Sequence, residues 1–324
     1  MILAADVGAT NARLGLFEFA RQRLIPTVVH KYQNRDYKSF DAILDAFLGT
    51  TPKVTSACFG IAGPVLDGKV HLTNLNWIID QRECESRLAT TVALLNDMEA
   101  TGYGISQLRP DDLLTLNPGV PDENASAALI ASGTGLGESA LQCNGLGRIP
   151  VPAEAGHADF APNNDLESEL LLYLRKRFGH VSWDRVLSGP GLYLIYEFLR
   201  DTGQTAENPE IAKRIRTGDP GAVISQAALE NECELCVRAL NVFASIYGSE
   251  SGNMALRYLA RAGVYLGGGI APKIRTKLTD GNFMQAFAAK GRMKAMLELV
   301  PVYVILNDQA ALLGAAHYAA TKLE

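Results

Sequence analysis

The sequence contains few cysteines and few tryptophans. Among its 324 residues there are five cysteines and two tryptophans. An odd, sparse set of cysteines argues against a disulfide framework and favours a reducing compartment. Cys233 and Cys236 form a C-x-x-C, but no second cysteine pair or Cys/His cluster accompanies them to complete a zinc site. Their spacing from neighbouring apolar residues predicts instead that both are buried on one face of a helix.

Long apolar runs and an excess of positive charge are also missing. No run reaches the roughly 20 apolar residues that a transmembrane helix requires. The N-terminus has no basic region, and Asp6 interrupts its apolar residues, so it predicts a buried strand and not a signal peptide. The formal net charge of -5 at pH 7 argues against a nucleic-acid partner. We therefore expect a cytoplasmic protein without a membrane or nucleic-acid partner.

The chain is long enough for two domains, because 324 residues exceed one typical core. Periodicity predicts strands at 2–7, 13–18, 54–62, 91–95, 127–132, 262–266 and 301–306, and helices from about 98 and at 165–178, 190–201, 222–247 and 308–322. Their alternation predicts an α/β fold. The proline-containing stretch 108–126 is expected to connect the halves, and the last strand and helix to pack back on the first. This predicts a small α/β domain (1–107 plus 298–324) and a large one (108–297).

One short pattern occurs twice, at residues 3–16 and 129–141. Each copy is an apolar strand, a tight Gly/Thr turn and a second apolar stretch. Such a turn exposes several backbone N–H groups in one concavity, which attracts phosphate. Glycine tolerates positive φ there and lets the backbone approach a ligand closely. Either copy alone is also compatible with an ordinary β-hairpin, but the pair suggests two related halves that bind one phosphate chain.

Asn96 and Asp97 follow a predicted buried strand. Ligands of open α/β sheets bind beyond the carboxyl ends of strands, and an aspartate there can accept a proton from a substrate hydroxyl. The alternative is that the pair caps the following helix. The two residues could also divide these roles.

Two further segments carry groups suited to a ligand. Glu154 and His157, three apart in a loop, can present an acceptor and a mixed donor–acceptor to one polyol, although a structural histidine is the simpler alternative. Residues 267–269 are three glycines after a strand, where a flat ring such as adenine could lie against the backbone, or where the chain merely turns. The sequence contains neither a P-loop nor a dinucleotide-binding motif.

Taken together, these segments resemble the bacterial ATP-dependent glucokinases of the hexokinase/actin-like ATPase superfamily, in the group without a zinc-binding cysteine cluster. The resemblance runs nearly end to end. Its motifs lie at residues 6–13, 61–64, 73–74, 96–97, 133–137, 154–162, 179–191 and 267–272. The family usually has a second glycine where this chain has Ala9, and a sugar-contacting glutamate where it has Asp184.

The resemblance implies two RNase H-like (actin-like ATPase) domains with an interdomain cleft that closes on the sugar. It implies phosphorylation of glucose at its 6-hydroxyl from ATP, with Mg²⁺ held mainly through the nucleotide phosphates and water and not by a protein metal site. Asp97 would be the catalytic base. The sugar would be bound by Asn96, Asp97, Glu154, His157 and Asp184. The nucleotide would be bound by Ala5, Asp6, Val7, Gly8, Ala9, Thr10, Asn11, Gly133, Thr134, Gly135, Gly267, Gly268 and Gly269.

Several alternatives stay open at this point. Another hexose, such as mannose or glucosamine, is compatible with Asp184. A non-catalytic sugar-sensing regulator is a second alternative, although no DNA-binding domain is apparent. A phosphoryl donor other than ATP is a third. The sequence does not set the oligomeric state and allows a homodimer.

Overall fold

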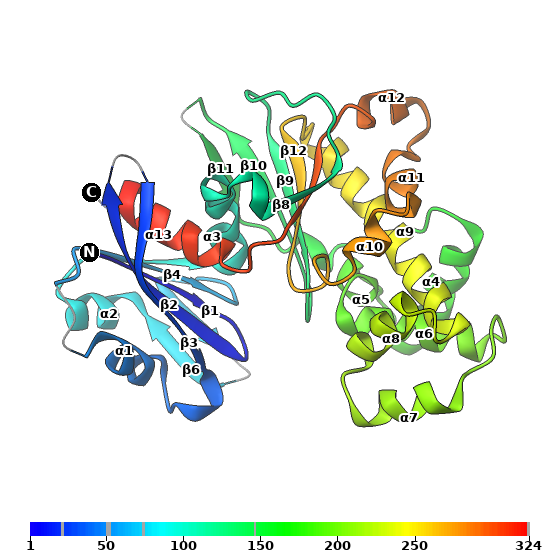
Figure 1. Ribbon diagram of the computed structural model, residues 1–324, viewed down its shortest axis with the longest axis horizontal. Helices are drawn as coiled ribbons and strands as arrows, with labels where there is room; N and C mark the ends of the chain where they lie inside the picture. The colour runs from blue at the N-terminus through cyan, green and yellow to red at the C-terminus, as the bar shows by residue number, and fades with distance from the viewer. Residues whose placement is uncertain (21–22, 50–52, 73–74, 146, 323–324) are drawn as a thin grey trace. The chain divides into compact units, whose positions relative to one another are not determined.

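The computed structural model describes residues 1–20, 23–49, 53–72, 75–145 and 147–322. The predicted motif residues Thr73 and Asn74 lie outside the described residues. The chain groups into two units (Figure 1). Unit 1 comprises residues 1–112, 149–152 and 307–324, and unit 2 comprises residues 113–148 and 153–306. None of the helices in the described ranges is both long and apolar enough to cross a membrane.

Unit 1 contains a five-stranded sheet. Across it, in order, lie β3 (Arg23–Gln33), β2 (Asn11–Ala20), β1 (Ile2–Val7), β4 (Ser56–Ile61) and β7 (Val92–Asn96). Strands β1, β2 and β3 pair antiparallel, whereas β1, β4 and β7 are parallel. A separate hairpin joins β5 (Lys69–Leu72) and β6 (Trp77–Asp80). The residues preceding α1 and following α3 form short 3₁₀ turns, Asn34–Asp36, Ile105–Gln107 and Pro110–Asp112.

Both faces of this sheet are covered by helices (Figure 1). Helices α1 (Phe40–Leu48) and α2 (Gln81–Leu88) lie on one face, and α3 (Asp97–Gly104) and α13 (Ala310–Lys322) on the other. The residues of β1 alternate between the two: Leu3 belongs to the core under α1, and Ala4 to the core under α13. This two-sided burial explains why β1 is almost wholly apolar.

Unit 2 repeats this topology. Its six-stranded sheet has the order β11 (Arg148–Val151), β10 (Leu136–Cys143), β9 (Ala127–Ser132), β12 (Gly263–Gly267), β13 (Val302–Ile305) and β8 (Leu113–Asn117). Residues 149–151 of β11 pair in this sheet but group with unit 1. Strands β9 and β10 form an antiparallel hairpin, and β9, β12 and β13 are parallel. The order β2-β1-β4-β7 therefore recurs as β10-β9-β12-β13. The duplicated pattern in the sequence is a duplicated fold, and the expected α/β class is confirmed.

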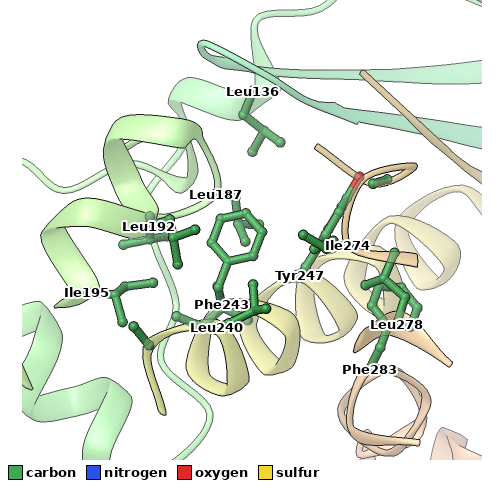
Figure 2. Close-up of a cluster of buried hydrophobic side chains, with 14 of the residues drawn as sticks. Leu136, Leu187, Leu192, Ile195, Leu240, Phe243, Tyr247, Ile274, Leu278 and Phe283 are labelled. Carbon is green, nitrogen blue, oxygen red and sulfur yellow. The ribbon is translucent and has the colours of Figure 1, made fainter. Parts of the chain in front are cut away.

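The helices of unit 2 surround the buried helix α9 (Glu234–Tyr258). They are α4 (Asp165–Phe178), α5 (Trp183–Val186), α6 (Gly189–Asp201), α7 (Pro209–Thr217), α8 (Pro220–Leu229), α10 (Arg275–Leu278), α11 (Asn282–Ala288) and α12 (Lys294–Leu297), with 3₁₀ turns at Ala155–His157 and Gly291–Met293. Figure 2 shows Phe243 of α9 among Leu187 and Leu192, which flank the start of α6. The start of α6 is marked by its N-cap Ser188, whose Oγ accepts from the Gly191 N–H at 3.1 Å.

Three sequence predictions differ from the structure. The single helix expected at 222–247 is two helices, because Asn231 adopts φ 55° and the chain turns before α9 starts. Cys233 is the N-cap residue of α9 and does not continue the apolar face of α8. Both Cys233 and Cys236 are buried and form no disulfide, as expected. The connecting stretch 108–126 contains β8, which pairs with β13.

The end of the chain also differs from the prediction. Strand β13 stays in the sheet of unit 2, and only α13 groups with unit 1. The structural divisions fall at 112/113, 148/149, 152/153 and 306/307, whereas the sequence predicted divisions at 107/108 and 297/298 alone. The reason is the pairing of β13 with both β12 and β8, which a local apolar pattern does not reveal.

Candidate active site

The first candidate phosphate turn joins β1 to β2 in unit 1. The Gly8 N–H donates to the Asn11 carbonyl at 2.9 Å. Asn34, only 1% exposed, donates from Nδ2 to the Gly8 carbonyl at 2.8 Å and from its N–H to the Thr10 carbonyl at 3.0 Å. Gly8 does not have a positive φ, so that reason for a glycine was wrong here. Ala9 and Thr10 are exposed, and the turn leaves its outer surface open.

Asn34 was missed by the sequence analysis. It lies in a 3₁₀ turn after β3, more than twenty residues from the turn that it holds, and no local motif marks it.

Asp6, near the end of β1, has a strongly perturbed carboxyl group. Burial, and then the negative charge of nearby Asp97, raise its pKa from 3.8 to about 6, and the Arg13 guanidinium opposes this rise. Arg13 itself bonds Asp308 at 2.6 Å, which holds its charge in place. Two carboxylates that repel one another are a favourable place for a cation. Within the described part of the chain, no three His, Cys, Asp or Glu side chains gather as metal ligands.

Asn96 and Asp97 both accept a hydrogen bond from the Met98 N–H at the start of α3. Asn96 is the N-cap: its Oδ1 accepts from the Met98 N–H at 2.9 Å, and its Nδ2 donates to the Gly63 carbonyl at 3.0 Å. Glu99 Oε2 completes a capping box by accepting from the Asn96 N–H at 3.0 Å. The alternative that this residue caps a helix is therefore confirmed for Asn96. Its predicted sugar contact, and the predicted role of Asp97, stay predictions.

Asp97 is the first residue of α3, and its position depends on how α3 packs. Its Oδ1 accepts from the Met98 N–H at 2.9 Å. A Cβ atom added at Gly104 of α3 would lie 1.9 Å from the Ala310 carbonyl oxygen, and one at Gly314 of α13 would lie 1.7 Å from that of Ala100. The two helices therefore approach so closely that only glycine fits at both positions. This packing holds the half-buried Asp97 side chain at the end of β7.

The second candidate phosphate turn, in unit 2, is bonded to the segment before α6. The Gly133 N–H donates to the Gly135 carbonyl at 2.8 Å, and the Gly189 N–H donates to the Gly133 carbonyl at 2.8 Å. Ser132 Oγ donates to the Leu187 carbonyl at 2.7 Å. These bonds join the turn to the start of α6.

The third glycine segment requires glycine at only one of its three positions. Gly268 has φ +78°, and a Cβ there would lie 2.3 Å from the Ser132 carbonyl oxygen. At Gly269 no heavy atom lies within 4 Å of the added Cβ. The Ile270 N–H also donates to the Ser132 carbonyl at 3.1 Å. The backbone of this segment therefore packs directly on the second phosphate turn.

These segments of unit 2 share a pocket of about 660 Å³. It is lined by Gly133, Thr134, Gly189, Pro190, Leu192, Tyr193, Asp219, Pro220, Gly221, Ala222, Ser225, Gln226, Leu229, Gly269, Ile270, Lys273 and Ile274. The volume lies within the range of small-molecule sites. Apolar side chains form most of the wall, as a base and ribose need, and two predicted nucleotide segments meet in it. The residues present therefore fit an adenosine. We call this the nucleotide pocket.

The sugar-binding residues predicted in unit 2 lie close to the second turn. Glu154 is the N-cap residue of the 3₁₀ turn Ala155–His157, which His157 ends. Both side chains are largely exposed, and Glu154 Oε2 lies 3.9 Å from His157 Nε2. A Cβ added at Gly156 would lie 2.2 Å from the Leu136 carbonyl oxygen, so this turn packs tightly on β10. Asp184 Oδ1 accepts from the Leu136 N–H at 2.8 Å. Asp184 thus anchors the second turn, a contact that the sequence analysis missed.

A buried acidic pair on β10 and α9 was also missed. Glu138 is 1% exposed, and neither carboxyl oxygen has a hydrogen-bond partner among the described residues. Burial, and then the charge of Glu250, raise the pKa of Glu138 to about 8. Glu250 is fully buried and bonded to Asn253 and Arg257. Glu138 follows the second turn by three residues, where an apolar residue would be expected in the core.

Comparison with known proteins places the chain in one family. The family model described as Glucokinase matches residues 3–322. A glucokinase of Nostoc punctiforme is 41% identical over 99% of both chains, and one of Cronobacter sakazakii is 36% identical over 97% of this chain and 95% of its own. The crystal structure of a glucokinase from an Antarctic psychrotroph superposes with a TM-score of 0.86 at 33% identity, covering 98% of each chain. The chain belongs to the glucokinase family.

Proposed function

We propose that this ATP-dependent hexose kinase transfers the γ-phosphoryl group of ATP to the 6-hydroxyl of D-glucose, with Asp97 as general base. The observation that carries the mechanism is the placement of Asp97 at the carboxyl end of β7, held by the close packing of α3 on α13 and electrostatically coupled to Asp6. An acid at the end of a parallel strand is well placed to meet a ligand.

The reaction asks the protein for positioning and for charge stabilisation. The 6-hydroxyl oxygen forms a bond to the γ-phosphorus, the bond from that phosphorus to the β–γ bridging oxygen breaks, and ADP leaves. The hydroxyl proton passes to a carboxylate oxygen of Asp97. Asn96, Glu154, His157 and Asp184 would hold the sugar by hydrogen bonds. Asn96 and Asp184 are already bonded to the backbone, which restricts them to their present rotamers.

The nucleotide would be held by three backbone segments. Residues 5–11 and 133–135 would bind phosphate oxygens, and residues 267–269 would flank the adenosine in the nucleotide pocket. Mg²⁺, when bound, neutralises phosphate charge. Asp6 is the residue that would hold it, through water, and the raised pKa of Asp6 fits a carboxylate that gains a cation when substrate binds. The five unpaired cysteines and the use of ATP support a cytoplasmic location.

A coupled assay of the purified chain tests the proposed reaction. The panel contains glucose, mannose and glucosamine as acceptors, and ATP, ADP and polyphosphate as donors. We expect transfer from ATP with the highest kcat/KM on glucose. Transfer to none of these sugars, or a clear preference for another sugar or donor, would overturn the assignment.

Asp97→Asn tests the general base. Removing a general base lowers rate by roughly 10²–10⁴-fold, so we expect kcat to fall by this amount while glucose affinity and unfolding midpoint stay close to wild type. Glu99→Gln is a matched control, because it removes the charge of a neighbouring carboxylate. The amide oxygen of the new glutamine can still accept from the Asn96 N–H. Near-normal turnover of Asp97→Asn would exclude Asp97 as the base.

A further inference from the structure

Asn34 is bonded to the first candidate phosphate turn through both its side chain and its backbone. Its Nδ2 donates to the Gly8 carbonyl at 2.8 Å, and its N–H donates to the Thr10 carbonyl at 3.0 Å. Asn34 is buried, and its own carbonyl accepts from the Tyr37 N–H at 3.1 Å, which holds the segment that carries it. Two alternate carbonyls of the turn are therefore directed toward one buried residue.

These two bonds set the direction of two backbone N–H groups in the turn. In a planar trans peptide, the C=O of one residue and the N–H of the next point in opposite directions. The Gly8 carbonyl faces Asn34, so the Ala9 N–H points away from it. The Thr10 carbonyl also faces Asn34, so the Asn11 N–H points to the same side. Neither N–H donates to an acceptor among the described residues, and Ala9 is exposed. Two such groups on one side of an exposed turn suit an anion.

The turn is not closed as an ordinary two-residue hairpin. In such a hairpin, the two residues that flank the loop can exchange a reciprocal pair of backbone bonds. Here the Gly8 N–H donates to the Asn11 carbonyl at 2.9 Å, but within the described part of the chain the Asn11 N–H does not donate to the Gly8 carbonyl. That carbonyl accepts from Asn34 Nδ2 instead. The Asn11 N–H is therefore left for a ligand.

We propose that Asn34 is a positioning residue for the phosphoryl donor. Its side chain holds the Gly8 carbonyl, so that the N–H groups of Ala9 and Asn11 stay directed toward a phosphate oxygen of the nucleotide. This inference rests on the proposed function, in which residues 5–11 bind the phosphates of ATP. Asn34 is buried and acts through the turn, so it is not a catalytic residue.

Asn34→Leu tests this role, because it removes the bond to the Gly8 carbonyl and keeps a side chain of similar size. Asn34 Oδ1 has no partner among the described residues, so leucine loses no second side-chain bond. Loss of a hydrogen bond to a charged group weakens binding by roughly 10–100-fold. We expect a rise of this size in the Kd of AMPPNP, an ATP analogue whose γ-phosphoryl group is not transferred, measured by calorimetry at saturating glucose. The Kd of adenosine, which has no phosphate, should stay close to the wild-type value.

Asn34→Asp is a second variant, in case leucine prevents folding. It has the shape of asparagine, but an ionised carboxylate cannot donate to the Gly8 carbonyl. It should weaken AMPPNP and spare adenosine in the same way.

Ser39→Ala is the matched structural control. It removes the bond from the Ala42 N–H to Ser39 Oγ at the start of α1, a few residues after Asn34, and leaves the turn unchanged. Loss of a helix cap lowers stability, so the thermal midpoint should fall while both Kd values stay at wild type. A merely structural role for Asn34 would likewise lower the midpoint and leave the ratio of the two Kd values unchanged.

Hydrogen exchange of the wild-type chain tests the inference without a substitution. AMPPNP should slow the exchange of the Ala9 and Asn11 amide hydrogens, and adenosine should not. The inference is overturned if neither amide is protected, or if both Asn34 variants keep the wild-type ratio of the two Kd values. A chain that transfers no phosphate to glucose but shows these effects refutes the proposed reaction and supports the role of Asn34. A chain that transfers phosphate without them refutes the role of Asn34 alone.

Discussion

Glu138→Gln should stabilise this protein at high pH and have little effect at low pH. The Glu138 carboxyl faces the core, with no partner among the described residues, and the charged groups that act on it are Glu250 and Arg257 of α9. Tyr247 of the same helix lies close enough to interact with it. Glutamine has nearly the same shape and no charge, so the substitution removes the ionisation and keeps the packing.

The size of the effect follows from the difference between the folded and unfolded pKa of Glu138. Burial raises this pKa from 4.5 to about 8 in the folded protein. A pKa difference of one corresponds to about 1.4 kcal/mol of stability. Because the folded state binds this proton more tightly than the unfolded chain, its contribution to stability is fully present below pH 4.5 and is lost as pH rises through 8. The loss reaches at most about 5 kcal/mol by pH 9.

Urea unfolding of wild type and Glu138→Gln at pH 5, 7 and 9 measures this difference. We expect the two free energies of unfolding to be closest at pH 5, and the variant to gain on wild type by about 1 kcal/mol per pH unit above it. Glu18→Gln, which removes an exposed carboxylate from β2, is the control and should show no such trend. A difference between Glu138→Gln and wild type that is constant from pH 5 to pH 9 would refute the reasoning.

Three further predictions concern the candidate active site. Gly268→Ala should lower the thermal unfolding midpoint by several degrees or prevent folding, because the alanine Cβ would meet the Ser132 backbone and φ is +78°. Gly269→Ala is the control and should keep the wild-type midpoint, because no heavy atom lies within 4 Å of its Cβ. Asp184→Asn keeps an acceptor for the Leu136 N–H and should retain ATP affinity. Asp184→Ala loses this acceptor and should raise the KM of both ATP and glucose by roughly 5–100-fold. Equal KM values for the two variants would contradict this expectation. The pKa of Asp6 is about 6, so kcat/KM for ATP should fall as pH drops below 6, and a profile flat down to pH 5 would exclude its ionised form from the site.

Much of the local structure could be predicted from the sequence, because it depends on neighbours within a few residues. Strands β1 and β9 and helix α4 occupy the residues that periodicity indicated. Their apolar spacing and flanking turn residues are local signals. The glycine turns, and the cap at Asn96, were visible for the same reason.

Other features depended on residues far apart in the sequence. Asn34 forms a hydrogen bond to Gly8, and Asp184 forms one to Leu136. No spacing of residues in the sequence predicts either bond. The burial of Glu138 could not be predicted, because a glutamate in a strand is ordinarily solvated, and only the packing of α9 on the sheet that contains β10 removes its carboxyl group from water.

The sequence by itself determined many of the strands, turns and helices, and it predicted which residues would bind phosphate or accept a proton. The tertiary structure decided which of these side chains already use their hydrogen-bonding groups within the protein. A carboxylate, an amide or a hydroxyl has a fixed number of donors and acceptors, and bonds to distant backbone groups use some of them. What remains for a ligand at Asn96 or Asp184 is therefore a property of the folded chain.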